Sequence, residues 1–555
     1  MTEATKARIR ASMSDNALLR WSVLLLISFA MAVNYYFYDV LSPIQEDVIK
    51  KLGFSEAEYG SIFFAYSIPM TFFLMAAMGG IIADKLGIRI TGMVFFSSMV
   101  IGSFLTYYGT TDAFNNGGLG YDTLASFWVS YKPSFKMMAI GFFFFGMGAE
   151  TTCVVVSKAV VKWFTGKEMA TALGVNVGIA RVASALTFPV GAHLSDPVWN
   201  RPILLGAILM VSGLVAFVVY LFFDVAYDRR EAERKKAGLG EAEGEGDEFK
   251  LTDVFKLLVN PTYIFVALLC VTFYSGVFPF NKYVVNILQS KFEMTKQVAG
   301  TVVMFLPLAQ AAITPLFGLV FDLKGKGATL MIIGSVCLAA GHTVLALTPA
   351  HPAVGLMLLG VSFSLVPAVL WPSLAKIVDQ KRLGTAYGLT FTIQNYGLMV
   401  TPLLIGLILG AQNPGVADIQ SWSDKAGIAE KTVQVEKVRK ACEDWKPKDQ
   451  TAAVKELQEY CRAPAAFAAP EALAKARKVT KAAVYDYTYP LLMLAGFGLL
   501  GLLFAFLLKL ADRKAGYGLE TPNKKKGPAE ADGGSLTARG AEPPRGDDSP
   551  PGDAA

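Results

Sequence analysis

The sequence predicts an all-α membrane protein with twelve transmembrane helices in two pseudo-symmetric six-helix bundles. Three observations lead to this prediction: the composition, the spacing of the apolar stretches, and a similarity between the two halves of the chain. The 555 residues are 53% hydrophobic and only 17% charged. The mean hydropathy of +0.43 is too high for a soluble globular protein of this size.

Twelve stretches hold enough consecutive apolar residues to cross a hydrocarbon layer as helices, which takes about 20 residues each. The first of them follows a start with no cleavage-site pattern, so we expect it to remain as a spanning segment. In chain order the predicted spans are 20–46, 56–83, 89–108, 134–160, 168–194, 202–225, 262–289, 297–322, 328–348, 351–378, 383–411 and 485–511.

Lys and Arg are concentrated in the short loops that follow the even-numbered spans. Basic residues beside a span are retained on the cytoplasmic side, so this bias predicts that both termini are cytoplasmic. The same bias accounts for most of the formal net charge of +6. That charge therefore needs no nucleic-acid partner to explain it.

The two halves of the chain are related as repeats. Their alignment places Asp84 on Asp322, and a second alignment places Gly146 on Gly360. Parallel repeats of six spans are typical of transporters whose binding site lies between the halves. We therefore divide the chain into a first bundle (1–225), a charged cytoplasmic linker (226–261), spans 7–11 (262–411), an extracytoplasmic helical loop (412–484), the last span (485–511) and a disordered cytoplasmic tail (512–555).

Two of the five cysteines, Cys442 and Cys461, lie in the 412–484 loop, on the side predicted to be extracytoplasmic. Disulfides persist outside the reducing cytosol, so one interpretation is a disulfide that clips a helical hairpin. Two free thiols are the other. Ala, Lys and Glu with helical periodicity also make this loop a candidate contact for a protein partner.

Glu150 and Arg181 are charged residues deep inside predicted spans, where a charge costs about 2.5–3.5 kcal/mol. They lie at similar depths on the neighbouring spans 134–160 and 168–194, so their side chains are able to meet. One interpretation is a structural ion pair. The other is a site for a zwitterion, in which Glu150 accepts an ammonium and Arg181 binds a carboxylate through its planar fork.

The aligned positions in the second half, Ser364 and Asn395, are polar and uncharged. This pattern predicts an asymmetric polar cavity between the halves. Further lining residues are predicted where polar and aromatic side chains recur at the four-residue helical interval, although tyrosines also anchor spans at interfaces and tryptophans also serve as plain packing. These residues are Asn34 and Tyr38 in the first span, Tyr274 and Phe278 in the seventh, and Trp371 in the tenth.

Asp39 and Lys282 lie near the outer ends of equivalent spans in the two halves. One interpretation is an ion pair that closes the outer mouth of the cavity. The alternatives are a solvated carboxylate at a helix end and a lysine that snorkels to the interface.

The stretch "GGIIADKLGIR" (79–89) follows the second span, and a weaker copy, "GLVFDLKGKG" (318–327), follows the eighth. Both resemble the signature loop of the major facilitator superfamily. The resemblance implies close helix packing at the glycine and an inter-helix charge network that latches one conformation. It assigns gating roles to Asp84, Arg89 and Asp322.

Within that superfamily, "FYD" (37–39), "GMGAE" (146–150) and "IAR" (179–181) resemble the family of the animal lysosomal dipeptide transporter and its bacterial relatives. The resemblance implies dipeptide uniport by a monomer, with Glu150 and Arg181 holding the two ends of the substrate. The sequence has no permissible Asn-x-Ser/Thr glycosylation site, which favours a bacterial inner membrane over a lysosome.

The leading hypothesis is a secondary transporter that moves a small zwitterion, above all a dipeptide, by alternating access, as a uniporter or with protons. We find no nucleophile elbow, metal cluster or nucleotide motif, so neither an enzyme, a cofactor nor a metal is predicted. One alternative is an organic-anion exchanger that places Arg181 and Lys282 on a carboxylate. Another is a non-transporting sensor or scaffold that acts through the 412–484 loop.

Overall fold

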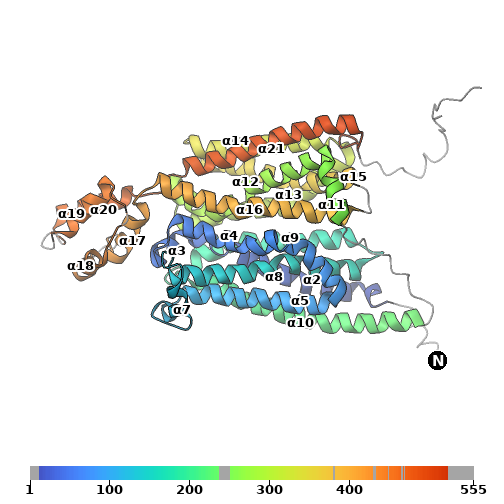
Figure 1. Cartoon of the computed structure of the whole chain (residues 1–555), viewed down its shortest axis with the longest axis horizontal. Coiled ribbons are helices and arrows are strands. Elements are labelled where there is room, and N and C mark those ends of the chain that lie inside the picture. The colour runs from blue at the N-terminus through green and yellow to red at the C-terminus, as the bar shows by residue number, and fades with distance from the viewer. Residues whose placement is uncertain are drawn as a thin grey trace, which may run out of the picture.

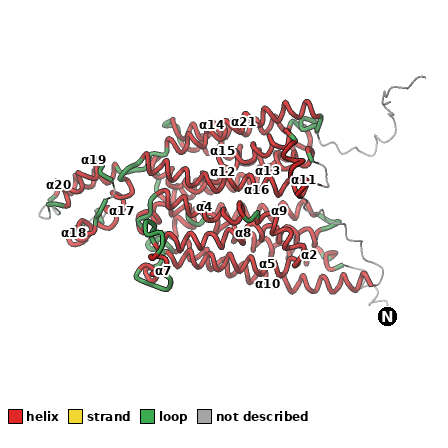
Figure 2. Tube along the Cα trace, in the orientation of Figure 1, coloured by secondary structure: helices red, strands yellow, loops and turns green. Residues whose placement is uncertain are grey.

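The computed structural model is helical throughout its described part, and every element in Figure 2 is a helix or a loop. Two groups of long helices lie side by side along their lengths (Figure 1). This arrangement confirms the predicted all-α fold with two related bundles. The structure describes residues 12–236, 251–378, 382–428, 433–447, 449–463, 467 and 469–522.

The first bundle contains the 3-10 helices η1 and η2 and nine α-helices, most of them apolar enough to be spans. Their bounds are η1 Met13–Asp15, α2 Ala17–Asp39, η2 Ser42–Ile44, α3 Gln45–Leu52, α4 Glu56–Phe72, α5 Met75–Gly109, α6 Asp112–Asn115, α7 Tyr121–Ser126, α8 Pro133–Phe164, α9 Met169–Leu194 and α10 Arg201–Lys236.

The second bundle begins with a short helix and is interrupted before its last span by four small helices. The bounds are α11 Leu251–Val259, α12 Pro261–Phe292, α13 Lys296–Lys324, α14 Gly327–Leu347, α15 Pro352–Ile377, α16 Leu383–Gln412, α17 Val416–Ala426, α18 Val435–Asp444, α19 Ala452–Cys461, α20 Pro470–Ala482 and α21 Thr488–Ala515.

Eleven of the helices in the described ranges are long and apolar enough to cross a membrane. The twelfth crossing is formed by α4 together with the first part of α5. The chain reverses inside this helix at Gly87, whose φ of 79° and ψ of 158° are not helical. Before Gly87, Gly79 packs on Thr151 of α8, whereas after it Gly109 packs on Met138. The second predicted span is therefore formed by α4 and the first part of α5, and the third by the remainder.

The signature-loop glycine that the fold requires is Gly87, because the φ and ψ at this turn are accessible essentially only to glycine. Close helix packing in the signature loop is provided by Gly79. A Cβ at Gly79 would lie 2.7 Å from the Thr151 hydroxyl, whereas a Cβ at Gly80 would meet nothing within 4 Å.

The α17–α20 unit, residues 416–482, projects from one end of the bundles (Figure 1). We call this end the α17 end, and the opposite end, where α2 begins and α21 finishes, the terminal end. The unit has a hydrophobic core of its own, centred on Trp422, Leu457 and Phe467. It is thus a small four-helix domain, larger than the predicted hairpin.

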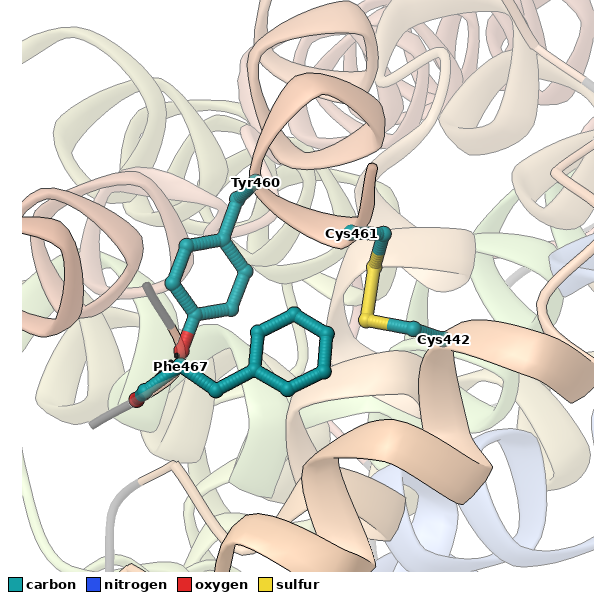
Figure 3. The surroundings of a disulfide bond; sticks show 4 residues. All are labelled: Cys442, Tyr460, Cys461 and Phe467. Atoms are coloured by element: carbon teal, nitrogen blue, oxygen red, sulfur yellow. Dashed lines mark hydrogen bonds between the residues drawn. A yellow bond between two sulfur atoms is a disulfide. The ribbon is translucent and has the colours of Figure 1, made fainter. Parts of the chain in front are cut away.

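The predicted disulfide between Cys442 and Cys461 is present in this unit and joins α18 to the end of α19. Figure 3 shows it beside Tyr460 and Phe467. The Tyr460 hydroxyl donates a hydrogen bond to Phe467 O (3.0 Å). The disulfide and this aromatic contact therefore both stabilise the end of α19. The other three cysteines are unpaired.

The predicted tail begins too early in the sequence. Helix α21 continues to Ala515, and Leu519 beyond it is fully buried. Backbone hydrogen bonds join Lys326 N to Glu520 O (3.1 Å) and Gly327 N to Leu519 O (2.8 Å). The segment up to 522 is therefore ordered against the start of α14, while 523–555 and the linker residues 237–250 lie outside the described residues.

We expect Gly87→Ala to destabilise the protein, because any side chain at this φ and ψ costs about 1–3 kcal/mol of backbone strain. Gly80→Ala is the matched control, since its Cβ enters open space on a helix that favours alanine. The measurement is the apparent melting temperature of the purified protein in detergent. Equal melting temperatures for the two variants would contradict the assigned reversal at Gly87.

Candidate functional site

Glu150 of α8 and Arg181 of α9 lie in the first bundle, and both interact electrostatically with the same two tyrosines. The hydroxyls of Tyr35 and Tyr38, both on α2, are each within electrostatic range of both charges. Each charged side chain is only half-buried. Among the described residues neither of the two makes an ion pair or a side-chain hydrogen bond, so the structural ion pair that the sequence allowed is absent.

Arg181 is held in place by aromatic faces. Its guanidinium carbon lies 5.4 Å from the centroid of the Tyr35 ring and 5.7 Å from that of Phe278 in the second bundle. Contact with ring faces stabilises the cation without using its N–H donors. The guanidinium fork therefore keeps its hydrogen-bonding capacity for a ligand.

Glu150 lies beside the amide of Asn34, which fixes α2 against α8. Asn34 Nδ2 donates to Ala149 O (3.3 Å) and lies 3.6 Å from Cys153 Sγ. One turn earlier on α8, Gly146 packs against the backbone of Tyr66 in α4. Asn34 therefore packs against the turn of α8 that carries Glu150, and its amide is engaged by Ala149 O; its role as a lining residue stays a prediction.

Five aromatic side chains extend from Arg181 into the second bundle, and we call them the aromatic row. Phe278 and Tyr274 are stacked, with centroids 5.6 Å apart. Trp371 Nε1 donates to the Tyr274 hydroxyl (3.0 Å), and the Trp371 ring stacks on Phe391 at 4.4 Å. The Tyr387 hydroxyl completes the row by donating to Trp371 O (3.1 Å).

Ser364 and Asn395 are both buried, but no hydrogen bond of the described residues joins either to this cluster. The Ser364 hydroxyl instead donates to Gly360 O within its own helix (2.9 Å). The sequence repeat aligned these two residues with the charged residues of the first half. It did not show that the Ser364 hydroxyl would bond to a carbonyl on the preceding turn, as serines in helices commonly do.

Asp39 and Lys282 form the ion pair that was one of the sequence interpretations. Lys282 Nζ donates to Asp39 Oδ1 (2.6 Å) and to Tyr38 O (2.7 Å), and Ser184 Oγ donates to Asp39 Oδ2 (2.5 Å). Lys282 is 1% exposed and Asp39 is 3% exposed, which rules out a snorkelling lysine in this conformation. The pair joins α2 to α12 and so ties the two halves together.

Other polar contacts between the halves gather at the same α17 end. They come from several helices and link backbone as well as side-chain atoms, so the described structure is closed at this end. These contacts are Tyr59 Oη to Lys282 O (3.0 Å), Gln45 Nε2 to Tyr487 Oη (3.1 Å), Gln289 Nε2 to Glu46 Oε2 (3.1 Å) and Lys296 Nζ to Ser195 Oγ (3.2 Å).

The signature-loop charges lie at the terminal end and pair within the first bundle. Asp84 pairs with Lys158 of α8, and Arg89 Nε donates to Asp224 of α10 (2.5 Å). Asp322, their counterpart in the second half, is exposed. These contacts tie α5 to its neighbours; the latching role that the resemblance implied stays a prediction.

Sequence reasoning missed the central member of this network, Asp224. The carboxylate is fully buried and accepts hydrogen bonds from Lys162 Nζ (2.7 Å) and the Tyr220 hydroxyl (2.9 Å) as well as from Arg89. The available signal was an aspartate in the last turn of the predicted span 202–225, on the side where the basic signature loop was expected. Tyr35 and Tyr66 carried no comparable signal.

No group of three or more potential metal ligands occurs among the described residues.

The model of the Major Facilitator Superfamily matches residues 27–402. The chain belongs to the Major Facilitator Superfamily. The match begins within α2, ends within α16, and includes Asp39, Glu150, Arg181 and Lys282.

Relatives of this superfamily member include the lysosomal dipeptide transporter MFSD1 of Bos taurus, 30% identical over 398 residues, 70% of this chain and 79% of that protein. The Homo sapiens protein of the same name is 29% identical over 403 residues, 71% of this chain and 80% of that protein.

Among solved structures, a bacterial homologue of the human lysosomal transporter Spinster, inward-facing and occupied, has a TM-score of 0.58 at 13% identity, covering 89% of this chain and 98% of that one. The nucleoside transporter NupG has a TM-score of 0.54 at 12% identity, covering 88% of this chain and 98% of that one. These two likenesses show the shared fold.

The family and the names of the relatives mark this chain as an integral, multi-pass membrane transporter of a small molecule, and point away from an enzyme. Within its predicted spans the chain carries two opposite charges, Glu150 and Arg181, that form no ion pair among the described residues.

We expect Lys282→Ala to destabilise this transporter by about 3–5 kcal/mol, because it leaves the Asp39 carboxylate buried without its partner. The double variant Asp39→Asn/Lys282→Met should recover much of the loss, since it removes both charges. Lys51→Ala is the control: Lys51 pairs with Asp424 at an exposed site (2.6 Å), where a pair contributes about 0–1 kcal/mol. Melting temperatures that fall equally in Lys282→Ala and Lys51→Ala would contradict the buried pair.

Proposed function

We propose that this transporter moves dipeptides, or closely similar zwitterions, across the membrane by alternating access, as a uniporter or with a coupled proton. The observation that carries the proposal is the separation of Glu150 from Arg181. Arg181 lies over the ring of Tyr35 at 5.4 Å, and neither Glu150 nor Arg181 has an ionic partner in the described chain. A zwitterion supplies the missing partner to each.

The energetic argument rests on the cost of ionised groups in the membrane. Each unpaired charge near mid-bilayer costs about 2.5–3.5 kcal/mol. Two neighbouring helices are able to reduce this cost by pairing the charges directly, yet Arg181 rests on ring faces instead. A substrate ammonium on Glu150 and a substrate carboxylate on Arg181 would satisfy both groups with charge-assisted hydrogen bonds.

The relatives support the same substrate class. At 29–30% identity, the bovine and human proteins are named lysosomal dipeptide transporters, and the family model covers the helices that carry Glu150 and Arg181. An anion exchanger that uses Arg181 with Lys282 is less well supported, because Lys282 is already engaged by Asp39 (2.6 Å).

We also propose that the Asp39–Lys282 pair is the gate at the α17 end and that Asp84, Arg89 and Asp322 belong to the opposite gate. The described structure is closed at the α17 end by several polar contacts. Substrate can pass that end only if the Asp39–Lys282 pair separates.

For the orientation we propose that the α17 end is extracytoplasmic and that both termini are cytoplasmic, in a bacterial inner membrane. The disulfide between Cys442 and Cys461 supports this side for the α17–α20 unit, because disulfides persist in oxidising compartments. The unit is a candidate surface for a protein partner, and we expect the transporter to act as a monomer.

The test compares three ligands: a dipeptide such as Ala-Ala, its N-acetylated form, which lacks the ammonium, and its C-terminal amide, which lacks the carboxylate. Binding raises the melting temperature of the purified transporter, and titration gives an apparent Kd. We expect each capped ligand to bind about 10- to 100-fold more weakly, the range expected for a lost hydrogen bond to a charged group.

Two variants assign the ends of the ligand. Glu150→Gln should abolish discrimination against the N-acetylated form and keep discrimination against the amide, whereas Arg181→Ala should do the reverse. Glu436→Gln and Arg439→Ala, on the exposed helix α18, are matched controls that should keep both. Equal binding of all three ligands by the unaltered protein would contradict the zwitterion site, and preference for the N-acetylated ligand would favour an anion exchanger.

A further inference from the structure

We infer that the aromatic row is the subsite for the side chain of the C-terminal residue of the dipeptide, and that it selects aromatic and large apolar side chains there. This inference rests on the proposed function, because it needs a dipeptide held between Glu150 and Arg181. The inference specifies which residue of the dipeptide is selected and which type of contact selects it.

The charges set the direction of the bound dipeptide. Glu150 is in α8, whose Gly146, one turn earlier, packs against the backbone of Tyr66 in α4 of the first bundle. The Arg181 guanidinium lies over the ring of Phe278 in α12 of the second bundle. The ammonium end of the substrate therefore lies toward α4 and α8, and the carboxylate end lies toward the second bundle.

The aromatic row starts where the carboxylate end is held. Phe278 lies under the Arg181 guanidinium at 5.7 Å and stacks on Tyr274 with an angle of 9° between the rings. A carboxylate bound to Arg181 brings the Cα of the C-terminal residue next to Phe278. The side chain on that Cα is then the part of the substrate nearest to the row.

The chemistry of the row favours an aromatic or apolar group over a polar one. The Trp371 N–H is used by the Tyr274 hydroxyl (3.0 Å) and the Tyr387 hydroxyl by Trp371 O (3.1 Å), so both donors are satisfied inside the row. Phe278, Trp371 and Phe391 remain half-buried and present ring faces and edges. Such surfaces recognise other rings through stacking and edge contacts.

The experiment compares two isomeric dipeptides, Ala-Phe and Phe-Ala, which have the same composition and the same terminal charges. Apparent Kd values come from titration of the full-length purified transporter in detergent, read as melting temperature or heat of binding. We expect Ala-Phe to bind about 3- to 10-fold more tightly than Phe-Ala, the range that one good aromatic contact provides.

Variants of the row then locate the preference. Trp371→Leu and, independently, Phe391→Leu should bring the ratio of the two Kd values close to one, and Trp371→Phe should retain it. Phe255→Leu, on the exposed face of α11, is the control and should keep the ratio of the unaltered protein. The ratio is read within each variant, so a general loss of stability does not mimic the effect.

Equal binding of the two isomers by the unaltered protein, tighter binding of Phe-Ala, or a preference that survives Trp371→Leu and Phe391→Leu would each overturn the subsite while leaving dipeptide transport in place. Failure of every dipeptide to bind would overturn the proposed function and the subsite together.

Discussion

The separation of two opposite charges inside an apolar bundle is the constraint on which the rest of the structure depends. Glu150 and Arg181 lie on adjacent helices and act on the same tyrosines, so direct pairing would be the cheapest local solution. Arg181 instead lies over the faces of Tyr35 and Phe278. In the proposed function, the two ends of the substrate join the two charges.

The buried pair at the α17 end has the opposite arrangement. Lys282 and Ser184 occupy both oxygens of Asp39, so the Asp39 and Lys282 charges are paired and buried, whereas Glu150 and Arg181 have no ionic partner among the described residues. The Asp39–Lys282 contact joins α2 to α12 and so ties the two halves together at that end.

The fold could be predicted from the sequence because hydropathy and span length are local properties. The Asp39–Lys282 contact could also be foreseen as one interpretation, since the two residues occupy equivalent spans at similar depths. The reversal at Gly87 falls between the predicted spans 56–83 and 89–108, because the charged residues Asp84, Lys85 and Arg89 interrupt the apolar run there. The separate core of the α17–α20 unit depends on contacts between distant segments, such as Trp422 with Tyr460, which periodicity does not encode. Ser364 shows the limit of repeat symmetry, because equivalence in sequence did not bring its hydroxyl into the charged site.

The measurement that tests the central claim most directly is an experimental structure of the transporter with a bound dipeptide. The account predicts that the substrate carboxylate lies within hydrogen-bonding distance of Arg181 and the ammonium within that distance of Glu150, with the two side chains still apart. A direct ion pair between Glu150 and Arg181, with the dipeptide bound elsewhere, would contradict it.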